Sequence, residues 1–379
     1  MPVRCDLFCA VIDNYGDLGV CWRLARQLAA EHDVAVTLWV DDLASFAHMA
    51  PGLDAAARTQ RLGGITVRHW DGDMAEAVPG ELIIEGFGCP LPARFVAAMA
   101  RCQPAPVWLN LDYLSAEDWV EGCHGLVSID QATGLVRHFW FPGFTAATGG
   151  LLREAGLLAA RDAFQADRSA QAAFWQGLGI AEADAFSRKI SLFSYENAAI
   201  EALLDALAES ESSTLLLVPA GRALADVARW AGTRAATLTH GTRLARGRLR
   251  VVILPFLSHD DYDRLLWACD LNAVRGEDSF VRAQWAARPL LWHIYPQDEG
   301  AHLAKLDAFV GRVNAAAGQP AIWATAQQAW NGLPGREVWP ALLAELPRLA
   351  VAARDWSARL ATQPDLATGV MRFYASRVE

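Results

Sequence analysis

The chain has 379 residues, of which 53% are hydrophobic and only 20% are charged. This composition excludes a disordered or low-complexity protein, and at roughly 100–200 residues per domain the length predicts two domains. The 33 basic and 43 acidic side chains give a formal net charge of −10. A general nucleic-acid-binding protein is therefore excluded, whereas a basic protein partner would be attracted wherever the acidic groups cluster.

The cysteine pattern and the N-terminus both predict a cytoplasmic location. The seven cysteines are scattered and include no C-x-x-C pair, which excludes a disulfide framework and a cysteine zinc site. Asp6 and Asp13 interrupt the early apolar run, so no signal peptide is predicted. We expect a soluble, cytoplasmic protein that binds neither nucleic acid nor membranes.

Short apolar runs alternate with helical patterns through the first half of the chain. Residues 5–12 and 34–40 are predicted as buried strands, and the segment between them, 17–32, has apolar side chains at helical spacing. Further strands are predicted over three shorter runs, 65–70, 82–87 and 107–111. This alternation is typical of a parallel sheet that helices cover on both faces.

A looser stretch, 139–185, separates this half from a second alternating region. Strands are predicted there over 189–195, 215–218, 251–256, 271–274 and 290–295, and helices over 198–208, 260–269 and 277–287. We place the domain boundary near residue 183, which gives domains of residues 1–183 and 184–361. A terminal helix, about 362–379, is expected to pack back on the first domain. Ligands of such sheets bind beyond the carboxyl ends of the strands, so the loops there are the candidate sites.

The first candidate loop is Asp13-Asn14-Tyr15-Gly16-Asp17-Leu18-Gly19, between the first strand and the first helix. The dinucleotide fingerprint G-x-G-x-x-G is absent, which disfavours a Rossmann dehydrogenase. Two carboxylates in one turn can bind a cation, divide acid and base roles, or hold a metal. Equally, Asp17 could do no more than cap the helix.

The second candidate loop, Arg275-Gly276-Glu277-Asp278-Ser279, lies between a strand and a helix. Backbone N–H groups at a helix start bind anions, and Arg275 could add a charged contact to a phosphate. The carboxylates of Glu277 and Asp278 would repel a diphosphate, so they would face sugar hydroxyls or a cation. A solvated acidic first turn is the alternative.

Other patterns are weaker. Aromatic side chains at strand ends can stack on a nucleobase, although most such residues belong to a core. His259, His293 and His302 match no zinc signature, and Asp71-Gly72-Asp73 fits a surface turn better than a metal–diphosphate motif.

Two long blocks carry a resemblance to a known family. The run 13–28, Asp-Asn-Tyr-Gly-Asp-Leu-Gly-Val-Cys-Trp-Arg-Leu-Ala-Arg-Gln-Leu, closely resembles the opening of the EarP family. The second block is similar to that family too. It consists of the run 275–285, Arg-Gly-Glu-Asp-Ser-Phe-Val-Arg-Ala-Gln-Trp, and the nearby run 292–299, Trp-His-Ile-Tyr-Pro-Gln-Asp-Glu. The blocks lie almost the whole chain apart, so the resemblance covers essentially its full length.

The resemblance implies a GT-B fold, an α/β architecture of two facing Rossmann-like domains with parallel sheets and an interdomain cleft. It implies an inverting transfer of L-rhamnose from dTDP-β-L-rhamnose to an arginine of translation elongation factor P, which activates that factor. The acceptor would bind on the N-terminal domain and the nucleotide sugar mainly on the C-terminal one. No cofactor and no metal are implied.

The resemblance also implies roles for individual residues. Asp17 would be the general base, with Asp13 and Glu277 helping to hold the guanidinium. The implied substrate-binding residues are Asn14, Tyr15 and Gly16 in the first loop, Arg275, Gly276, Asp278, Ser279, Tyr295 and Gln297 at the nucleotide sugar, and Phe193, Tyr195, Phe256, His259 and Tyr262 at the base and sugar. His259 departs from the pattern, because a glutamine is expected three positions after Phe256.

Two rival functions stay open on the sequence. One is a GT-B transferase or epimerase that acts on a small-molecule nucleotide sugar, a glycan or a lipid-linked acceptor; no basic amphipathic stretch supports the lipid version. The other is a module that binds a translation factor without catalysis, which the intact acidic pair and the intact 275–279 turn disfavour.

Overall fold

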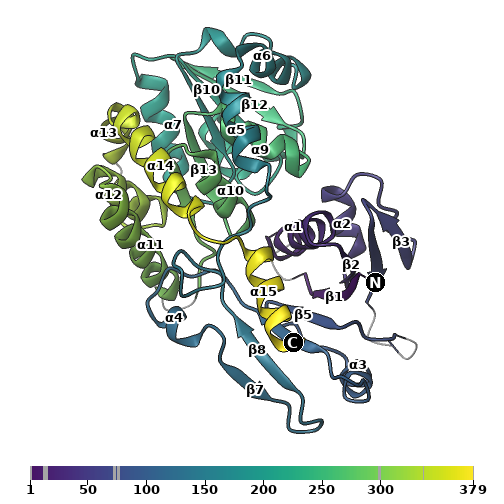
Figure 1. Ribbon diagram of the computed structural model, residues 1–379. Coiled ribbons are helices and arrows are strands. Elements are labelled where there is room, and N and C mark those ends of the chain that lie inside the picture. The colour runs from purple at the N-terminus through teal and green to yellow at the C-terminus, as the bar shows by residue number, and fades with distance from the viewer. Residues whose placement is uncertain are drawn as a thin grey trace. The chain divides into compact units, whose positions relative to one another are not determined.

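The computed structural model describes residues 2–11, 16–70, 74, 77–297, 300–335 and 337–378. It forms two compact units, one of Met1–Ala155 with Thr362–Glu379 and the other of Gly156–Ala361 (Figure 1). Each unit contains one mostly parallel sheet. The predicted α/β class with two Rossmann-like units is confirmed.

Eight strands form the sheet of the first unit. Their spatial order is β3 (Thr59–Leu62), β4 (Ile65–His69), β2 (Val34–Val40), β1 (Val3–Cys9), β5 (Leu82–Gly86), β6 (Val107–Leu111), β8 (Val136–Trp140) and β7 (Val127–Ile129). The six inner strands pair in parallel, with Leu7 of β1 opposite Leu38 and Ile84, whereas β3 and β7 pair antiparallel at the two edges. The helices of this unit are α1 (Gly16–Glu31), α2 (Leu43–Met49), α3 (Ala93–Met99), α4 (Trp119–Cys123) and α15 (Leu366–Val378).

The core of the first unit explains why its central strands were predictable. Cys5 to Cys9 of β1 are buried on both faces, which suits a run that is apolar except for Asp6. On one face Phe8 stacks on Trp39 at 5.7 Å and meets Phe95 edge-on at 4.9 Å. The terminal helix α15 contacts α1 in this unit, and Phe373 packs edge-on against His138.

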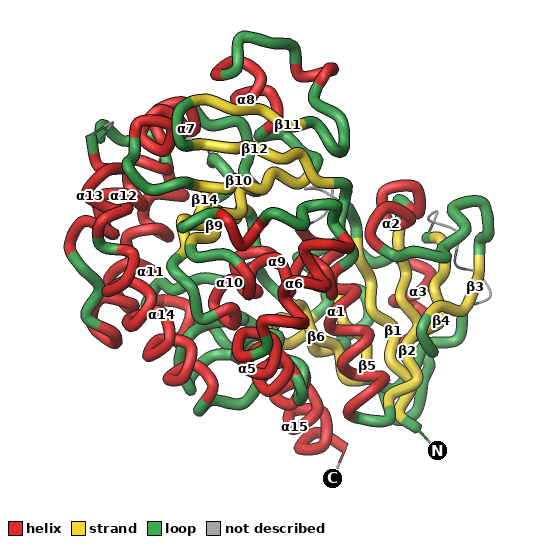
Figure 2. Tube along the Cα trace, turned by 90° about the horizontal axis from the view of Figure 1, so that it is seen from above, coloured by secondary structure: helices red, strands yellow, loops and turns green. Residues whose placement is uncertain are grey.

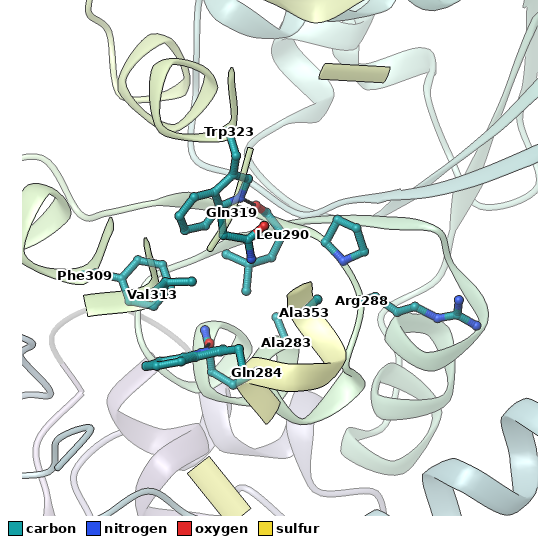
Figure 3. A pocket seen from close by; sticks show the side chains of 11 residues that line it. Ala283, Gln284, Arg288, Leu290, Phe309, Val313, Gln319, Trp323 and Ala353 are labelled. Carbon is teal, nitrogen blue, oxygen red and sulfur yellow. Dashed lines mark hydrogen bonds between the residues drawn. The ribbon is translucent and has the colours of Figure 1, made fainter. Parts of the chain in front are cut away.

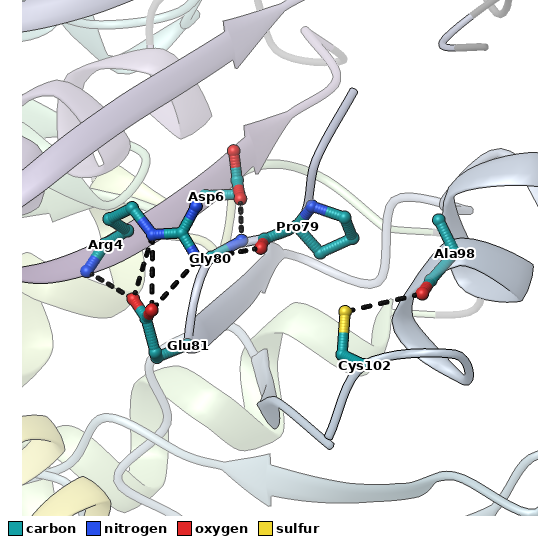
Figure 4. A network of polar contacts seen from close by, with 7 residues as sticks. All are labelled: Arg4, Asp6, Pro79, Gly80, Glu81, Ala98 and Cys102. Carbon is teal, nitrogen blue, oxygen red and sulfur yellow. Dashed lines mark hydrogen bonds and ion pairs between the residues drawn. The ribbon is translucent and has the colours of Figure 1, made fainter. Parts of the chain in front are cut away.

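A polar network joins the amino ends of β1 and β5 (Figure 4). The backbone N–H and the side chain of Arg4 both donate to Glu81, at 2.8 and 2.9 Å. The buried Asp6 accepts hydrogen bonds from Gly80 N and Trp39 Nε1, each at 2.8 Å. A Cβ at Gly80 would overlap the Arg4 carbonyl oxygen, so the close approach of these two segments requires glycine there.

The sheet of the second unit has six strands, and Figure 2 shows β11, β12 and β10 running side by side. The full spatial order is β11 (Arg243–Arg246), β12 (Leu249–Leu254), β10 (Thr214–Pro219), β9 (Arg188–Leu192), β13 (Leu271–Arg275) and β14 (Leu290–His293). Every pair is parallel except β11 with β12. The helices are α5 (Leu157–Ala166), α6 (Arg168–Gly177), α7 (Ala199–Glu209), α8 (Leu224–Trp230), α9 (His259–Ala268), α10 (Asp278–Ala286), α11 (Ala301–Ala317), α12 (Ala321–Trp330), α13 (Val338–Ala344) and α14 (Leu346–Ala361), with 3-10 turns η1 (Ala183–Ala185) and η2 (Ala235–Thr237).

Both sheets share one topological feature. The first strand of each unit lies between the second parallel strand and a strand reached later, so β1 lies between β2 and β5, and β9 lies between β10 and β13. The chain connections diverge on either side of these pairs. The carboxyl ends of β1 with β5 and of β9 with β13 are therefore the places where such sheets bind ligands.

The predicted domain boundary near residue 183 lies inside the second unit. Helix α5 packs on α9 and α10, and Gln165 Nε2 donates to the carbonyl oxygens of Trp267 and Ala286 at 3.1 and 3.0 Å. Trp175 of α6 joins a core that includes Leu215 and Leu217 of β10. Helices α5 and α6 precede β9, the first strand of the sheet on which they pack. A boundary placed just before that strand therefore lies too late in the chain.

Other differences concern strand limits. The first strand, predicted over 5–12, is Val3–Cys9, and Ile12 lies outside the described residues. The stretch from 139 begins inside β8, a strand that the sequence pattern did not reveal because it mixes charged and apolar side chains. Within the described ranges, none of the helices combines the length and apolar character needed to cross a bilayer.

Candidate functional site

The best-defined site of the second unit lies at the carboxyl ends of β9 and β13. The two strands are adjacent, and Phe193 N donates to the Ala273 carbonyl oxygen at 2.9 Å just past β9. The loop after β9 brings in Phe193 and Tyr195, and the loop after β13 brings in Arg275 and Ser279. Four residues predicted at the nucleotide sugar thus meet at one point of the fold.

Arg275 is the central charge of this site. It is only 7% exposed, and its guanidinium carbon lies 4.6 Å from the ring centroids of both Phe193 and Tyr195. Its Nη1 is buried without a hydrogen-bond partner in the described part of the chain. A buried cation is costly unless an anion or further hydrogen bonds compensate it. The site is therefore prepared for an anionic ligand.

The 275–279 turn is held by its own backbone and by β14. Arg275 N donates to Ser279 Oγ at 3.1 Å, and that hydroxyl donates back to the Arg275 carbonyl oxygen at 2.5 Å. Gly276 has a φ of 59°, a conformation that favours glycine, and its carbonyl oxygen accepts from Trp292 Nε1 at 2.8 Å. Helix α10 starts at Asp278, so the N–H groups of its first turn face out of this loop. The Ser279 hydroxyl, which was predicted to contact the ligand, thus holds the turn through its hydrogen bonds with the Arg275 backbone.

Aromatic side chains wall the site. Tyr262 of α9 packs edge-on against Phe193 at 5.7 Å, and Tyr295 packs edge-on against Tyr195 at 5.5 Å. Burial raises the pKa of the Tyr262 hydroxyl, on which Ser279, Asp278 and Arg275 also act. Tyr295 is 51% exposed, so it forms the outer rim.

The other predicted residues occupy different depths. His259 is the buried first residue of α9, and Phe256 is half-buried in the loop before it. Glu277 and Asp278 are both half-buried, which is intermediate between a solvated turn and a site wall. Gln297 is exposed, and its backbone N donates to His302 Nδ1 at 3.2 Å.

Sequence reasoning missed three residues that support this site. Trp292 holds the Gly276 carbonyl oxygen, as described above. His293 is buried behind Tyr195 with ring centroids 5.4 Å apart, and a hydrogen bond of 2.8 Å joins its Nδ1 to Ser194 Oγ. Arg222 follows β10 and is exposed, with its guanidinium carbon 5.8 Å from the Tyr195 ring centroid. The available signal was their position, with Trp292 and His293 at the carboxyl end of β14 and Arg222 after β10, because both strands end at the same edge as β13.

In the first unit, Asp17 lies where the fold predicts a ligand. Gly16 is the first residue of α1 and Asp17 the second, so Asp17 lies inside the helix, beyond the capping position. Its side chain is 4% exposed. A hydrogen bond to Cys21 and burial raise the pKa of the Cys9 thiol, and the Asp17 carboxylate adds to that shift. Asp17 is therefore a buried acid near the carboxyl end of β1.

The rest of the predicted first loop, Asp13, Asn14 and Tyr15, lies outside the described residues, as do Asp71 and Asp73. Among the residues that the structure describes, no group of three or more His, Cys, Asp or Glu side chains is arranged to hold a metal ion.

A separate pocket of the second unit lies at the far end of α10 (Figure 3). It is lined mainly by apolar side chains of α10, α11, α12 and α14, including Phe309 and Trp323. Its polar side chains are Gln284, Arg288 and Gln319, and Gln284 is engaged, because Gln284 Oε1 accepts from Trp356 Nε1 at 2.7 Å. None of the predicted site residues lines it.

Comparison with known proteins places these features in a family. The family model described as Elongation-Factor P (EF-P) rhamnosyltransferase EarP matches residues 5–375. The protein-arginine rhamnosyltransferase of Pseudomonas putida is 52% identical over 382 residues and is covered to 99%, as is this chain. Both findings extend over nearly the whole length, as the two sequence blocks predicted.

Solved structures give the same result. One, described as the structural basis for EarP-mediated arginine glycosylation of translation elongation factor EF-P, has a TM-score of 0.68 and 39% identity and covers 99% of each chain. Spinosyn rhamnosyltransferase SpnG, at 14% identity and a TM-score of 0.54, covers 98% of this chain and 99% of its own and shares the fold. The predicted GT-B fold class, the predicted resemblance and the predicted enzyme class, a glycosyltransferase, are confirmed.

Protonation of His293 should govern part of the acid sensitivity of the fold. Burial, with His302 and Arg275 nearby, lowers the pKa of His293 from 6.5 to about 4. Between these pH values the unfolded chain binds a proton that the folded chain does not, so the free energy of unfolding falls as pH drops from 6.5 towards 4. We expect His293→Gln to remove up to about 3 kcal/mol of that pH-dependent loss.

Urea unfolding at pH 7, 6, 5 and 4 measures this effect, with exposed His240→Gln as the matched histidine substitution. Equal losses in the wild type, His240→Gln and His293→Gln would contradict the assignment.

Proposed function

We propose that this chain, which belongs to the EarP family of elongation-factor P rhamnosyltransferases, moves L-rhamnose from dTDP-β-L-rhamnose to an arginine side chain of translation elongation factor P. The observation that carries the proposal is the buried Arg275 guanidinium at the end of β13, which contacts two aromatic rings and whose Nη1 has no hydrogen-bond partner among the described residues. A nucleoside diphosphate supplies both an anion for that cation and a base for the aromatic wall. The acceptor is a translation factor, so we place the enzyme in the cytoplasm.

The chemistry is a single inverting displacement. An arginine nitrogen of the acceptor attacks C1 of the rhamnose, the C–N bond forms as the C1–O bond to dTDP breaks, and the nitrogen loses one proton. A guanidinium has a pKa above about 12, so it needs a base to accept that proton. Asp17 is proposed as that base, and Asp13 and Glu277 as the carboxylates that hold the guanidinium.

The leaving group is handled without a metal in this proposal. dTDP departs with negative charge, which Arg275 and the N–H groups at the start of α10 would stabilise. Asp278, Gly276, Tyr295 and Gln297 are proposed around the nucleotide sugar, with Phe193, Tyr195, Phe256, His259 and Tyr262 at the base and sugar. Asn14, Tyr15 and Gly16 are proposed at the acceptor.

Intact-mass analysis of the acceptor tests the function. Purified chain, dTDP-β-L-rhamnose and elongation factor P should give an acceptor heavier by one rhamnose, and tandem mass spectrometry should place it on an arginine. Donor consumption without acceptor modification would favour a small-molecule transferase or an epimerase. Acceptor binding without donor turnover would favour a non-catalytic module.

Substitution of Asp17 separates a base from a structural carboxylate. Asp17→Asn keeps the size of the side chain and removes the proton acceptor, so the rate of transfer should fall by about 10²–10⁴-fold. Melting temperature and dTDP-rhamnose binding should stay near wild type, and Asp13→Asn should also be impaired.

The control for Asp17→Asn is Asp42→Asn. Asp42 caps α2 by accepting from Ser45 N at 3.0 Å, and asparagine caps about as well as aspartate, so this variant should stay close to wild type. Near-normal turnover of Asp17→Asn would remove Asp17 from the mechanism.

Loss of Arg275 should affect the donor and spare the acceptor. Arg275→Ala removes a charge-assisted contact worth about 1.5–3 kcal/mol, so titration with dTDP should show at least about tenfold weaker binding. Elongation factor P should bind as before, because its proposed surface is on the first unit. The reverse pattern would mean that the two units exchange roles.

Removal of divalent metal should leave turnover intact. Because Arg275 and the start of α10 would neutralise the leaving diphosphate, we expect full activity in excess EDTA. Activity that disappears in EDTA and returns with magnesium would contradict the metal-independent proposal and would bring Asp71 and Asp73 back as candidate ligands.

A further inference from the structure

A buried ion pair joins α9 to α10 behind the Arg275 site. Arg282 Nε donates to Asp263 Oδ1 at 2.9 Å and Arg282 Nη2 donates to Asp263 Oδ2 at 2.6 Å. The two side chains are 2% and 7% exposed. The contact is therefore a two-point fork between a planar guanidinium and a carboxylate, which fixes angle as well as distance.

Each member of the pair lies within three residues, along its helix, of a residue at the proposed donor site. Asp263 directly follows Tyr262, whose ring packs on Phe193. Arg282 lies three residues after Ser279, one turn further along α10, and Ser279 holds the backbone of Arg275. A shift of α9 against α10 would therefore change the spacing between the aromatic wall and the anion-binding turn.

Stability alone is a poor explanation for such a pair. Removing two charges from water costs about as much as their attraction returns, and apolar side chains of similar volume often replace buried pairs without loss of stability. Apolar packing, however, tolerates small sliding between helices, whereas a bidentate pair has one favourable geometry. The benefit of the pair is thus expected in the register of α9 against α10.

We propose that Asp263 and Arg282 are positioning residues for the nucleoside-diphosphate donor. By fixing α9 to α10 they hold Tyr262 at a set distance from Ser279 and Arg275, and the affinity for the diphosphate depends on that distance. This inference rests on the proposed donor site and adds to it two residues that do not touch the ligand.

Titration with dTDP and steady-state kinetics test the role. Asp263→Asn and Arg282→Met should each raise the dTDP dissociation constant and the donor KM by about tenfold, within the range of coupling energies measured for contacting charged residues. The acceptor KM should stay within about twofold, because the acceptor is proposed to bind the other unit. Arg282→Lys should fall between wild type and Arg282→Met, because lysine restores the charge without the fork.

The matched control is Arg264→Gln. Arg264 lies on the same helix α9 and pairs with Asp261 at 3.0 Å, but both side chains are about half exposed, and this variant should bind dTDP like wild type. Should Arg282→Met fail to fold, Asp263→Asn and Arg282→Lys, which change fewer atoms, carry the test. The double variant Asp263→Asn/Arg282→Met should bind dTDP no more weakly than whichever single variant binds it less tightly, because both substitutions break the same pair.

Two outcomes separate this inference from the proposed function. Variants that melt earlier but bind dTDP with wild-type affinity would show a purely structural pair and would overturn the inference alone. A wild-type chain that does not bind dTDP would overturn the donor assignment and, with it, the positioning role.

Discussion

The burial of one positive charge organises the second unit. Arg275 could gain solvation at the surface, yet its guanidinium is held between Phe193 and Tyr195, at 4.6 Å from each ring. Cation–π contacts recover part of the lost hydration, but much less than an anion would. The surrounding contacts fix the turn that carries this charge. They are the two Ser279 hydrogen bonds to Arg275, the Trp292 hydrogen bond to Gly276 and the start of α10.

The two units use the same topology with opposite charge. At the divergence point of β9 and β13 the fold presents a cation and helix N–H groups, and at that of β1 and β5 it presents the buried carboxylate of Asp17. The proposed anionic donor and the proposed cationic acceptor would use these two environments. The formal charge of −10 does not by itself explain either site, because each depends on one or two buried groups that a sum over the chain does not reveal.

The central strands could be predicted from the sequence because burial on both faces demands mainly apolar runs, as in Leu7 to Cys9 and Leu215 to Val218. Edge strands such as β7 and β11 could not be predicted, since a strand with one exposed side carries no such run. The domain boundary was misplaced for a related reason: α5 and α6 precede the sheet on which they pack, and only tertiary contacts reveal where they belong.

For the candidate site, the sequence could predict which residues share a loop but not which contacts they make. The motif around 275–279 places Arg275 and Ser279 in one turn, but the sequence could not show that the Ser279 hydroxyl hydrogen-bonds the backbone of Arg275. Nor could it reveal Trp292 or His293, which are one strand away in space. Asp17 illustrates the converse case: its position as the second residue of α1 places it beyond the cap, a distinction that depends on where the helix begins.

His293 shows how the charge of the site is kept constant. Burial lowers the pKa of His293 to about 4, and the positive charges of His302 and Arg275 add to that shift, because a protonated imidazole behind Tyr195 would be a further buried positive charge. At neutral pH His293 is therefore neutral, and its Nδ1 shares a hydrogen bond with Ser194 Oγ. A neutral His293 leaves Arg275 as the cation that faces the aromatic wall, so the attraction that the proposed site offers a diphosphate does not depend on protonation of this histidine at neutral pH.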